Sequence, residues 1–179
     1  MTDARRFPSL RCRQPGASRF ELLVCVALIG VFMAVFLERA LYYQEYAEKM
    51  AMDMTVENMR TGLRYRVADL MLANRMSQIS TLADENPMNW LADKPENYLG
   101  ERASATAPHS DGMWYFDRQK RELVYTVNNR RHFLPSVNRD FTVRFRAMRL
   151  KTPVALGGSG ATGEVWVRLA LVSDYRWLQ

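Results

Sequence analysis

Histidine, serine and aspartate, the three residue types of a hydrolase triad, stand side by side at His109, Ser110 and Asp111. In a working triad they come from separate segments that fold together, because neighbouring residues of a loop point in different directions. Pro108 precedes the three residues and predicts such a loop. We therefore expect no triad at this position.

Metal and cofactor sites are not predicted either. His132 has no cysteine or second histidine near it at the spacing of metal ligands. The aspartates of the second half do not form the pattern of a calcium loop; they are Asp111, Asp117, Asp140 and Asp174. Calcium held by loop carbonyls would leave no signal in a sequence. The sequence thus predicts a protein that is not an enzyme and has no cofactor.

A nucleic-acid site is the next possibility, because aromatic rings can stack on bases while arginines contact phosphates. The residues in question are Trp114, Tyr115, Phe116 and Tyr125, with Arg144 and Arg146. Such aromatic residues more often pack in a core or at a sheet edge. Four of the 25 basic residues and one of the 19 acidic residues precede residue 17, so the remaining 21 and 18 carry only +3. DNA binding is kept as an alternative, and no nucleic-acid partner is expected.

The most informative charge is Glu21, at the edge of a long apolar run. Residues 22–37 contain no charge, and Glu38 and Arg39 end the run. This length is close to what a helix needs to cross a bilayer. A secretory signal peptide would have a shorter apolar stretch that ends in a small-residue cleavage site. A carboxylate at such a boundary is costly to bury alone, so Glu21 needs a cationic partner.

The composition of the segments before and after this run predicts their location and structure. Residues 1–16 are a basic leader that stays in the cytoplasm, which places residues after 40 across the membrane. Residues 17–40 form a transmembrane helix, and residues 41–76 continue it as an amphipathic helix with one glycine, Gly62. An apolar stripe follows helical spacing along the second part: Met52, Val56, Met59, Leu63, Val67 and Leu70.

Residues 77–179 are expected to form an α+β head on this stripe. Residues 77–111 are punctuated by Pro and Gly and predict an irregular loop; its anchors to the core would be Trp90, Leu91, Tyr98 and Leu99. Residues 112–174 alternate apolar and polar types and predict about four antiparallel strands, at 113–117, 122–127, 141–147 and 164–173. The inner face of the last strand would carry Val165, Val167, Leu169 and Leu171.

The stretch from Gly16 to Gly30, GASRFELLVCVALIG, resembles the processing and assembly signature of type IV pilins and type II secretion pseudopilins. The resemblance implies that a prepilin peptidase cuts after Gly16 and that Ala17 becomes a methylated N-terminus. Glu21 is then the fifth residue and pairs with the N-terminal amine of a neighbouring subunit. Gly30 would let helices approach one another or loosen the helix during extraction; equally, it is a glycine that a membrane helix tolerates.

The sequence therefore favours a pseudopilin or minor pilin of the bacterial inner membrane, with its N-terminus in the cytoplasm and its head in the periplasm. Its partners would be other pilin-like subunits, the prepilin peptidase and an inner-membrane assembly platform. Two alternatives stay open. One is a DNA-binding or tip subunit of a DNA-uptake filament. The other is an uncleaved, signal-anchored periplasmic protein, which Ala17 and Arg19 favour because the family usually has a bulky residue and no charge there.

Overall fold

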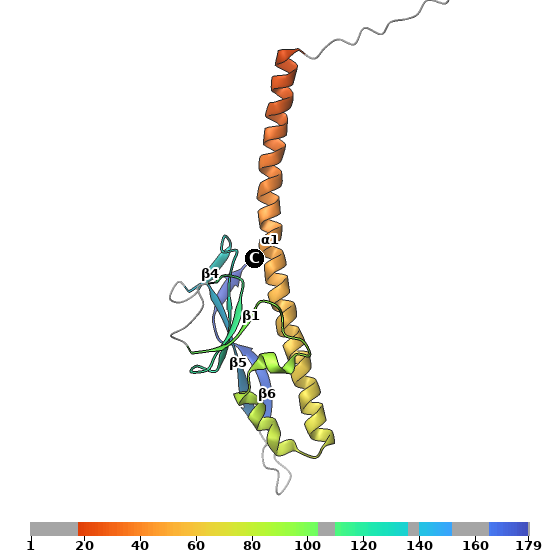
Figure 1. The fold of residues 1–179 in the computed structure, drawn as a ribbon, viewed down its shortest axis with the longest axis vertical. Helices are drawn as coiled ribbons and strands as arrows, with labels where there is room; N and C mark the ends of the chain where they lie inside the picture. The colour runs from red at the N-terminus through yellow and green to blue at the C-terminus, as the bar shows by residue number, and fades with distance from the viewer. Residues whose placement is uncertain (1–17, 104–109, 136–139, 152–164, 179) are drawn as a thin grey trace, which may run out of the picture. The chain divides into compact units, whose positions relative to one another are not determined.

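The computed structural model describes residues 18–103, 110–135, 140–151 and 165–178. Its elements (Figure 1) are α1 (Arg19–Leu72), the 3-10 helices η1 (Met76–Asp84) and η2 (Pro87–Trp90), and strands β1 (Tyr98–Arg102), β2 (Trp114–Asp117), β3 (Glu122–Thr126), β4 (Phe133–Pro135), β5 (Thr142–Lys151), β6 (Val165–Leu171) and β7 (Tyr175–Trp177). The chain forms two compact units, Met1–Leu41 and Tyr42–Gln179, and α1 contributes to both. The second unit is called the head below.

The predicted long helix is confirmed. Helix α1 has 54 residues, no proline and many strong helix formers, so nothing in its sequence interrupts the hydrogen-bonded backbone. Its apolar stripe faces the core of the head: Met52, Val56, Met59, Leu63 and Val67 are buried, and Leu70 packs against them. The helical spacing of these residues is therefore what attaches α1 to the sheet.

The sheet has five strands in the order β1-β2-β3-β5-β6, rather than four. The four predicted strands are present as β2, β3, β5 and β6, and each pairs antiparallel with its neighbour. The purely antiparallel arrangement was wrong, because β1 pairs parallel with β2. A register shift between Tyr98 and Glu101, with Gly100 at φ +85°, interrupts the alternation of β1, so its sequence does not read as a strand.

A second, two-stranded sheet pairs β4 with β7 antiparallel. Each strand has only three residues, which is too short to show a period in the sequence. The predicted inner face of β6 holds for Val167 and Leu169, which are buried, but not for Leu171, which is 46% exposed. The side chain of Val165, the fourth predicted residue, lies outside the described ones. Leu171 is the last residue of β6 and lines a groove between this strand and α1, which leaves its side chain accessible.

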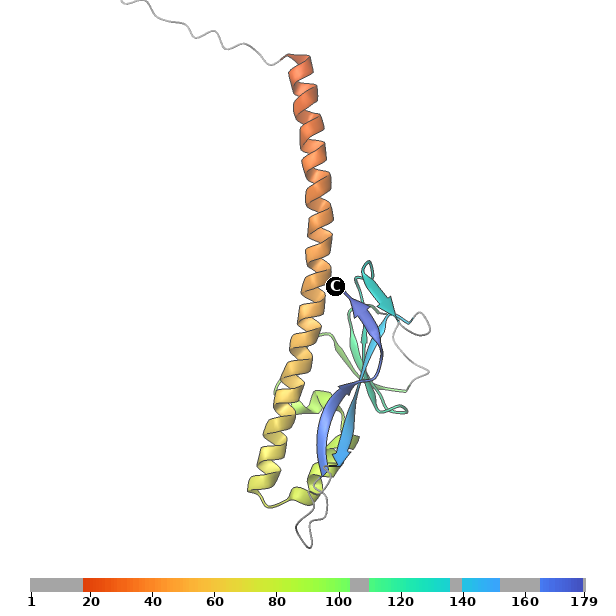
Figure 2. The ribbon, with the colours of Figure 1, turned by 180° about the vertical axis from the view of Figure 1, so that it is seen from behind.

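The interpretation of residues 77–111 as an irregular loop was wrong, because η1, η2 and β1 all lie there. Two polar side chains fix the segment to the head. Asn86 caps η2 by accepting a hydrogen bond from the Met88 amide at 3.0 Å, and its Nδ2 donates to the Tyr98 hydroxyl at 2.7 Å. Arg149 of β5 donates to the Ser80 carbonyl at 2.9 Å, which holds η1 against β5 and β6 (Figure 2).

The expected anchors of this segment are in place. Trp90 is buried, and Leu91 and Tyr98 pack against the core cluster. Leu99 is half-buried within β1. The prediction that apolar side chains pin this segment to the core is therefore confirmed for Trp90, Leu91 and Tyr98.

Gly62 allows the closest approach between α1 and η2, so replacing it should destabilise the head. A Cβ atom at this position would overlap the Trp90 carbonyl oxygen and lie 2.8 Å from the carbonyl carbon. Because these are backbone atoms of a packed turn, we expect Gly62→Ala to lower the free energy of unfolding by about 2 kcal/mol, despite the better helix propensity of alanine. Thermal unfolding of the full chain in detergent measures this change.

Gly30→Ala is the matched control, since the same substitution in the same helix meets no atom within 4 Å. We expect it to leave the unfolding of the head unchanged. Equal melting temperatures for Gly62→Ala and the parent chain would contradict the close approach at Trp90.

Candidate functional site

Helix α1 begins with a side-chain cap. The Ser18 hydroxyl accepts a hydrogen bond from the Glu21 amide at 3.2 Å, as expected for a serine just before the first helical turn. Glu21 lies in that first turn and is exposed, and its carboxylate has no ion pair among the described residues. A negative charge is favourable at this end of a helix because of the free backbone N–H groups. Gly16 and Ala17, the predicted processing residues, lie outside the described residues.

The apolar run that follows Glu21 is exposed throughout. Phe32 and Phe36 in this run have 70–73% of their surface accessible, and none of the most apolar stretch of α1 is buried. The helix is long and apolar enough to cross a membrane. Gly30 lies within this run with open space beside it. Large exposed apolar surfaces of this kind are typical of segments that contact lipid or another apolar surface.

The head portion of α1 carries a second apolar face. Tyr43, Tyr46, Met50 and Met54 are between 42% and 65% exposed. With 3.6 residues per turn, they lie roughly opposite the buried stripe that contains Met52. We call these four residues the outer stripe. Single exposed apolar residues are common, but a row of four on one helical face is a candidate packing surface.

Glu45 is a buried carboxylate on the core side of α1, with only 1% of its surface exposed. It accepts hydrogen bonds from the His132 amide at 2.8 Å and from the Trp177 indole N–H at 3.1 Å, and it contacts His132 Nδ1 at 2.7 Å. These donors come from β7 and from the turn before β4. One carboxylate therefore ties both strands of the small sheet to α1.

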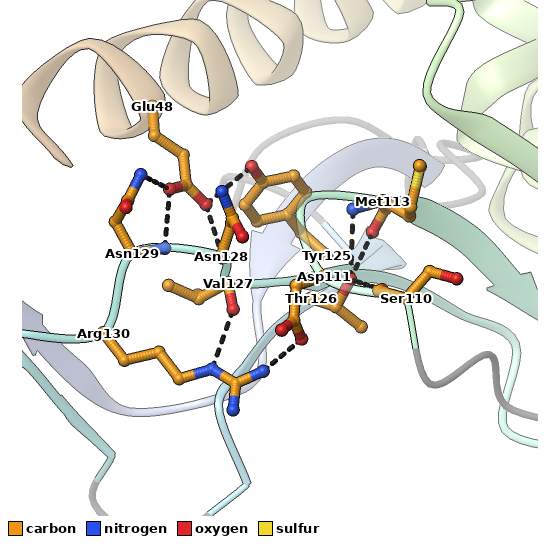
Figure 3. A network of polar contacts seen from close by, with 10 residues as sticks. All are labelled: Glu48, Ser110, Asp111, Met113, Tyr125, Thr126, Val127, Asn128, Asn129 and Arg130. Atoms are coloured by element: carbon orange, nitrogen blue, oxygen red, sulfur yellow. Dashed lines mark hydrogen bonds and ion pairs between the residues drawn. The ribbon is translucent and has the colours of Figure 1, made fainter. Parts of the chain in front are cut away.

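Glu48, one turn further along α1, binds the segment after β3 (Figure 3). Its carboxylate accepts hydrogen bonds from the amides of Asn128 and Asn129 at 2.7 and 2.9 Å and from the Tyr125 hydroxyl at 3.0 Å. The Asn129 side chain donates a further bond at 2.8 Å. We call Glu45 and Glu48 with these donors the polar clamp.

The neighbouring loop is fixed by a second set of bonds in the same view (Figure 3). Arg130 donates to the Val127 carbonyl at 3.0 Å and forms an ion pair with Asp111. The Thr126 hydroxyl donates to the Ser110 carbonyl at 2.8 Å and accepts from the Met113 amide at 3.1 Å. The segment around Ser110 is thereby joined to the end of β3.

The pKa shifts in the head follow from this packing. Burial raises the pKa of the Tyr125 phenol, and the adjacent Glu48 carboxylate raises it further, so the phenol stays a donor over the physiological pH range. Hydrogen bonds from Asn86 and Arg118 lower the pKa of the Glu101 carboxyl. The shifts keep the Tyr125 phenol protonated as a donor to Glu48 and the Glu101 carboxylate charged beside Arg118.

Among the described residues, Ser110, Asp111 and His132 each contact other groups. His109 lies outside the described residues, Asp111 pairs with Arg130, and Ser110 contributes its carbonyl to Thr126. His132 contacts Glu45 rather than a second histidine or a cysteine. Within residues 18–103, 110–135, 140–151 and 165–178, no group of three metal-binding side chains comes together.

The aromatic residues considered as a stacking platform for DNA pack inside the head, as the favoured interpretation expected. The four rings are almost completely buried because they form the inner and outer faces of β2 and β3: Trp114, Tyr115, Phe116 and Tyr125. Arg144 and Arg146 both form ion pairs with the buried Glu122 carboxylate. These rings are not available to stack on bases, and the two arginines have a structural partner.

No family model, curated protein or solved structure matches the chain. The resemblance to pilin-like proteins therefore depends on residues 16–30.

Proposed function

We propose that this protein is a pilin-like structural subunit, a pseudopilin or minor pilin, of a type IV filament or a type II secretion system. The observation that carries the proposal is an apolar helix, exposed along its whole first part, that has a single carboxylate, Glu21, in its first turn. A membrane anchor needs the apolar surface but has no use for that carboxylate. A subunit that packs among identical apolar helices needs such a charge, because the charge can fix its position relative to its neighbours.

The role of Glu21 follows from the cost of charge in an apolar bundle. An unpaired carboxylate among packed helices is strongly unfavourable, whereas a carboxylate paired with an amine is tolerated. A cut after Gly16 creates an amine at Ala17, four residues before Glu21. Pairing Glu21 of one subunit with the Ala17 amine of the next fixes the stagger between helices that otherwise present only apolar side chains.

The outer stripe supports the same function. Helices that pack only within the bilayer would leave their heads free to rotate, and Tyr43, Tyr46, Met50 and Met54 supply a contact surface outside it. Gly30 has open space beside it, where a second helix could approach within the apolar run. The leader, by the distribution of its arginines, keeps the N-terminus in the cytoplasm and the head in the periplasm.

Cross-linking through the outer stripe tests assembly. In a chain whose Cys12 and Cys25 are replaced by serine, Met50→Cys should form covalent adducts with pilin-like chains, either copies of itself or other subunits, on mild oxidation of membranes. Lys120→Cys, in the exposed turn between β2 and β3, is the control and should give far fewer adducts. Equal yields from both positions would contradict packing through α1.

A further inference from the structure

The head has a groove of about 710 Å³ between α1 and β6. One wall is the last part of α1, including Leu63, Val67 and Met71, and the other is β6 from Trp166 to Leu171. All of these residues belong to the head, so the groove is independent of the membrane-spanning segment. Its base is apolar because Leu63, Val67 and Leu169 belong to the core cluster.

Strand β6 forms the open edge of the five-stranded sheet, and its pairing with β5 shows which backbone groups are free. The Val172 amide donates to the Arg144 carbonyl at 2.8 Å, so this pair is hydrogen-bonded. Antiparallel pairs alternate between bonded and non-bonded, so positions 170, 168 and 166 also bond β5. The amides and carbonyls of Val167, Leu169 and Leu171 then point toward the groove, and no backbone bond to them occurs among the described residues.

The groove is positively charged. Arg60, Arg64 and Arg168 line it, and its lining contains no acidic residue. Arg60 pairs with Glu57, whereas Arg64 and Arg168 have no ion pair among the described residues. An open strand edge is normally covered or blocked, since it is a template for another strand. Among the described residues, no strand pairs with this edge, and Arg64 and Arg168 lie beside it.

We propose that this groove binds an extended, acidic segment of a different protein, which adds a strand to the free edge of β6. Main-chain hydrogen bonds to Val167, Leu169 and Leu171 supply affinity, and acidic side chains of the segment meet Arg64 and Arg168. Its alternate side chains are apolar and lie against Leu63 and Val67. A second copy of β6 fits poorly, because its sequence has no acid and would bring Arg168 of each copy close together.

A synthetic peptide of alternating glutamate and valine, as long as β6, tests the proposal with the full chain in detergent micelles. We expect the peptide to bind and to slow hydrogen exchange at the amides of Val167, Leu169 and Leu171 specifically. Absence of binding, or binding without protection of these three amides, would overturn strand addition.

Reversing the charge of the groove tests whether its partner is acidic. Arg64→Glu with Arg168→Glu, both exposed positions, should weaken binding about tenfold and favour a lysine–valine peptide instead. Arg131→Glu, an exposed arginine outside the groove, should leave the affinity unchanged. Equal binding of the glutamate and lysine peptides to the parent chain would overturn the choice of an acidic partner. Protection of the same amides by self-association at high concentration would instead assign the groove to a second copy.

Discussion

Replacing Glu45 by alanine is expected to lower the free energy of unfolding of the head by about 3 to 4 kcal/mol, and the melting temperature by about 10 °C. The change removes the acceptor for the Trp177 indole and the His132 amide, and it leaves a buried donor on Trp177, which is only 3% exposed. Because these donors hold β4 and β7 to α1, we expect the small sheet to detach first. Tryptophan fluorescence and thermal unfolding in detergent measure both effects.

Glu45→Gln separates hydrogen bonding from charge. The amide oxygen of glutamine can accept the bonds from Trp177 and His132 that Glu45 Oε1 accepts, and its NH2 can donate to His132 Nδ1. We expect this variant to lose about 1 kcal/mol or less. Glu57→Ala, an exposed position on the same helix, controls for the loss of a glutamate and should be close to the parent. Equal stability of Glu45→Ala and Glu57→Ala would refute the polar clamp.

Replacing Glu21 by alanine is expected to abolish incorporation into filaments while leaving membrane insertion intact. The apolar run, which drives insertion, is unchanged, whereas the only carboxylate able to fix the stagger with the Ala17 amine is lost. Separation of sheared filaments from membranes, followed by immunodetection of the subunit, measures this directly. We expect the subunit to stay in the membrane fraction.

The matched control is Glu38→Ala at the other end of the apolar run, which removes the same charge without touching the proposed pair. It should assemble like the parent chain. If Glu21→Ala assembles as well as Glu38→Ala, Glu21 only marks the membrane boundary. If both fail, loss of either glutamate disturbs insertion, and the specific role of Glu21 is wrong.

Local periodicity explains what could be predicted from the sequence of the head. The stripe from Met52 to Val67 repeats at helical spacing, and β5 alternates over many residues, so both elements were found. Strands β4 and β7 are too short for a period, and β1 is interrupted at Gly100. These strands exist because of tertiary pairing rather than local preference.

The polar clamp was not predicted from the sequence, for a different reason. Glu45 lies 87 residues from His132 and 132 residues from Trp177, so no local pattern joins them. One signal was present. Glu45 precedes Met52 by two helical turns, so it falls on the line of the buried stripe, where a charged residue needs partners. By contrast, Glu21 and Gly30 could be named as candidates because the linear order of charged and apolar residues is a local feature of the sequence, and their roles in assembly stay predictions.

The measurement that tests the account most directly is the intact mass and N-terminal sequence of the protein recovered from bacterial membranes, beside a Gly16→Ala variant. The proposed function predicts a chain that begins at methylated Ala17, and it predicts that Gly16→Ala keeps the leader. A parent chain that still carries residues 1–16 in cells with an active prepilin peptidase would contradict the filament function and leave a simple membrane anchor.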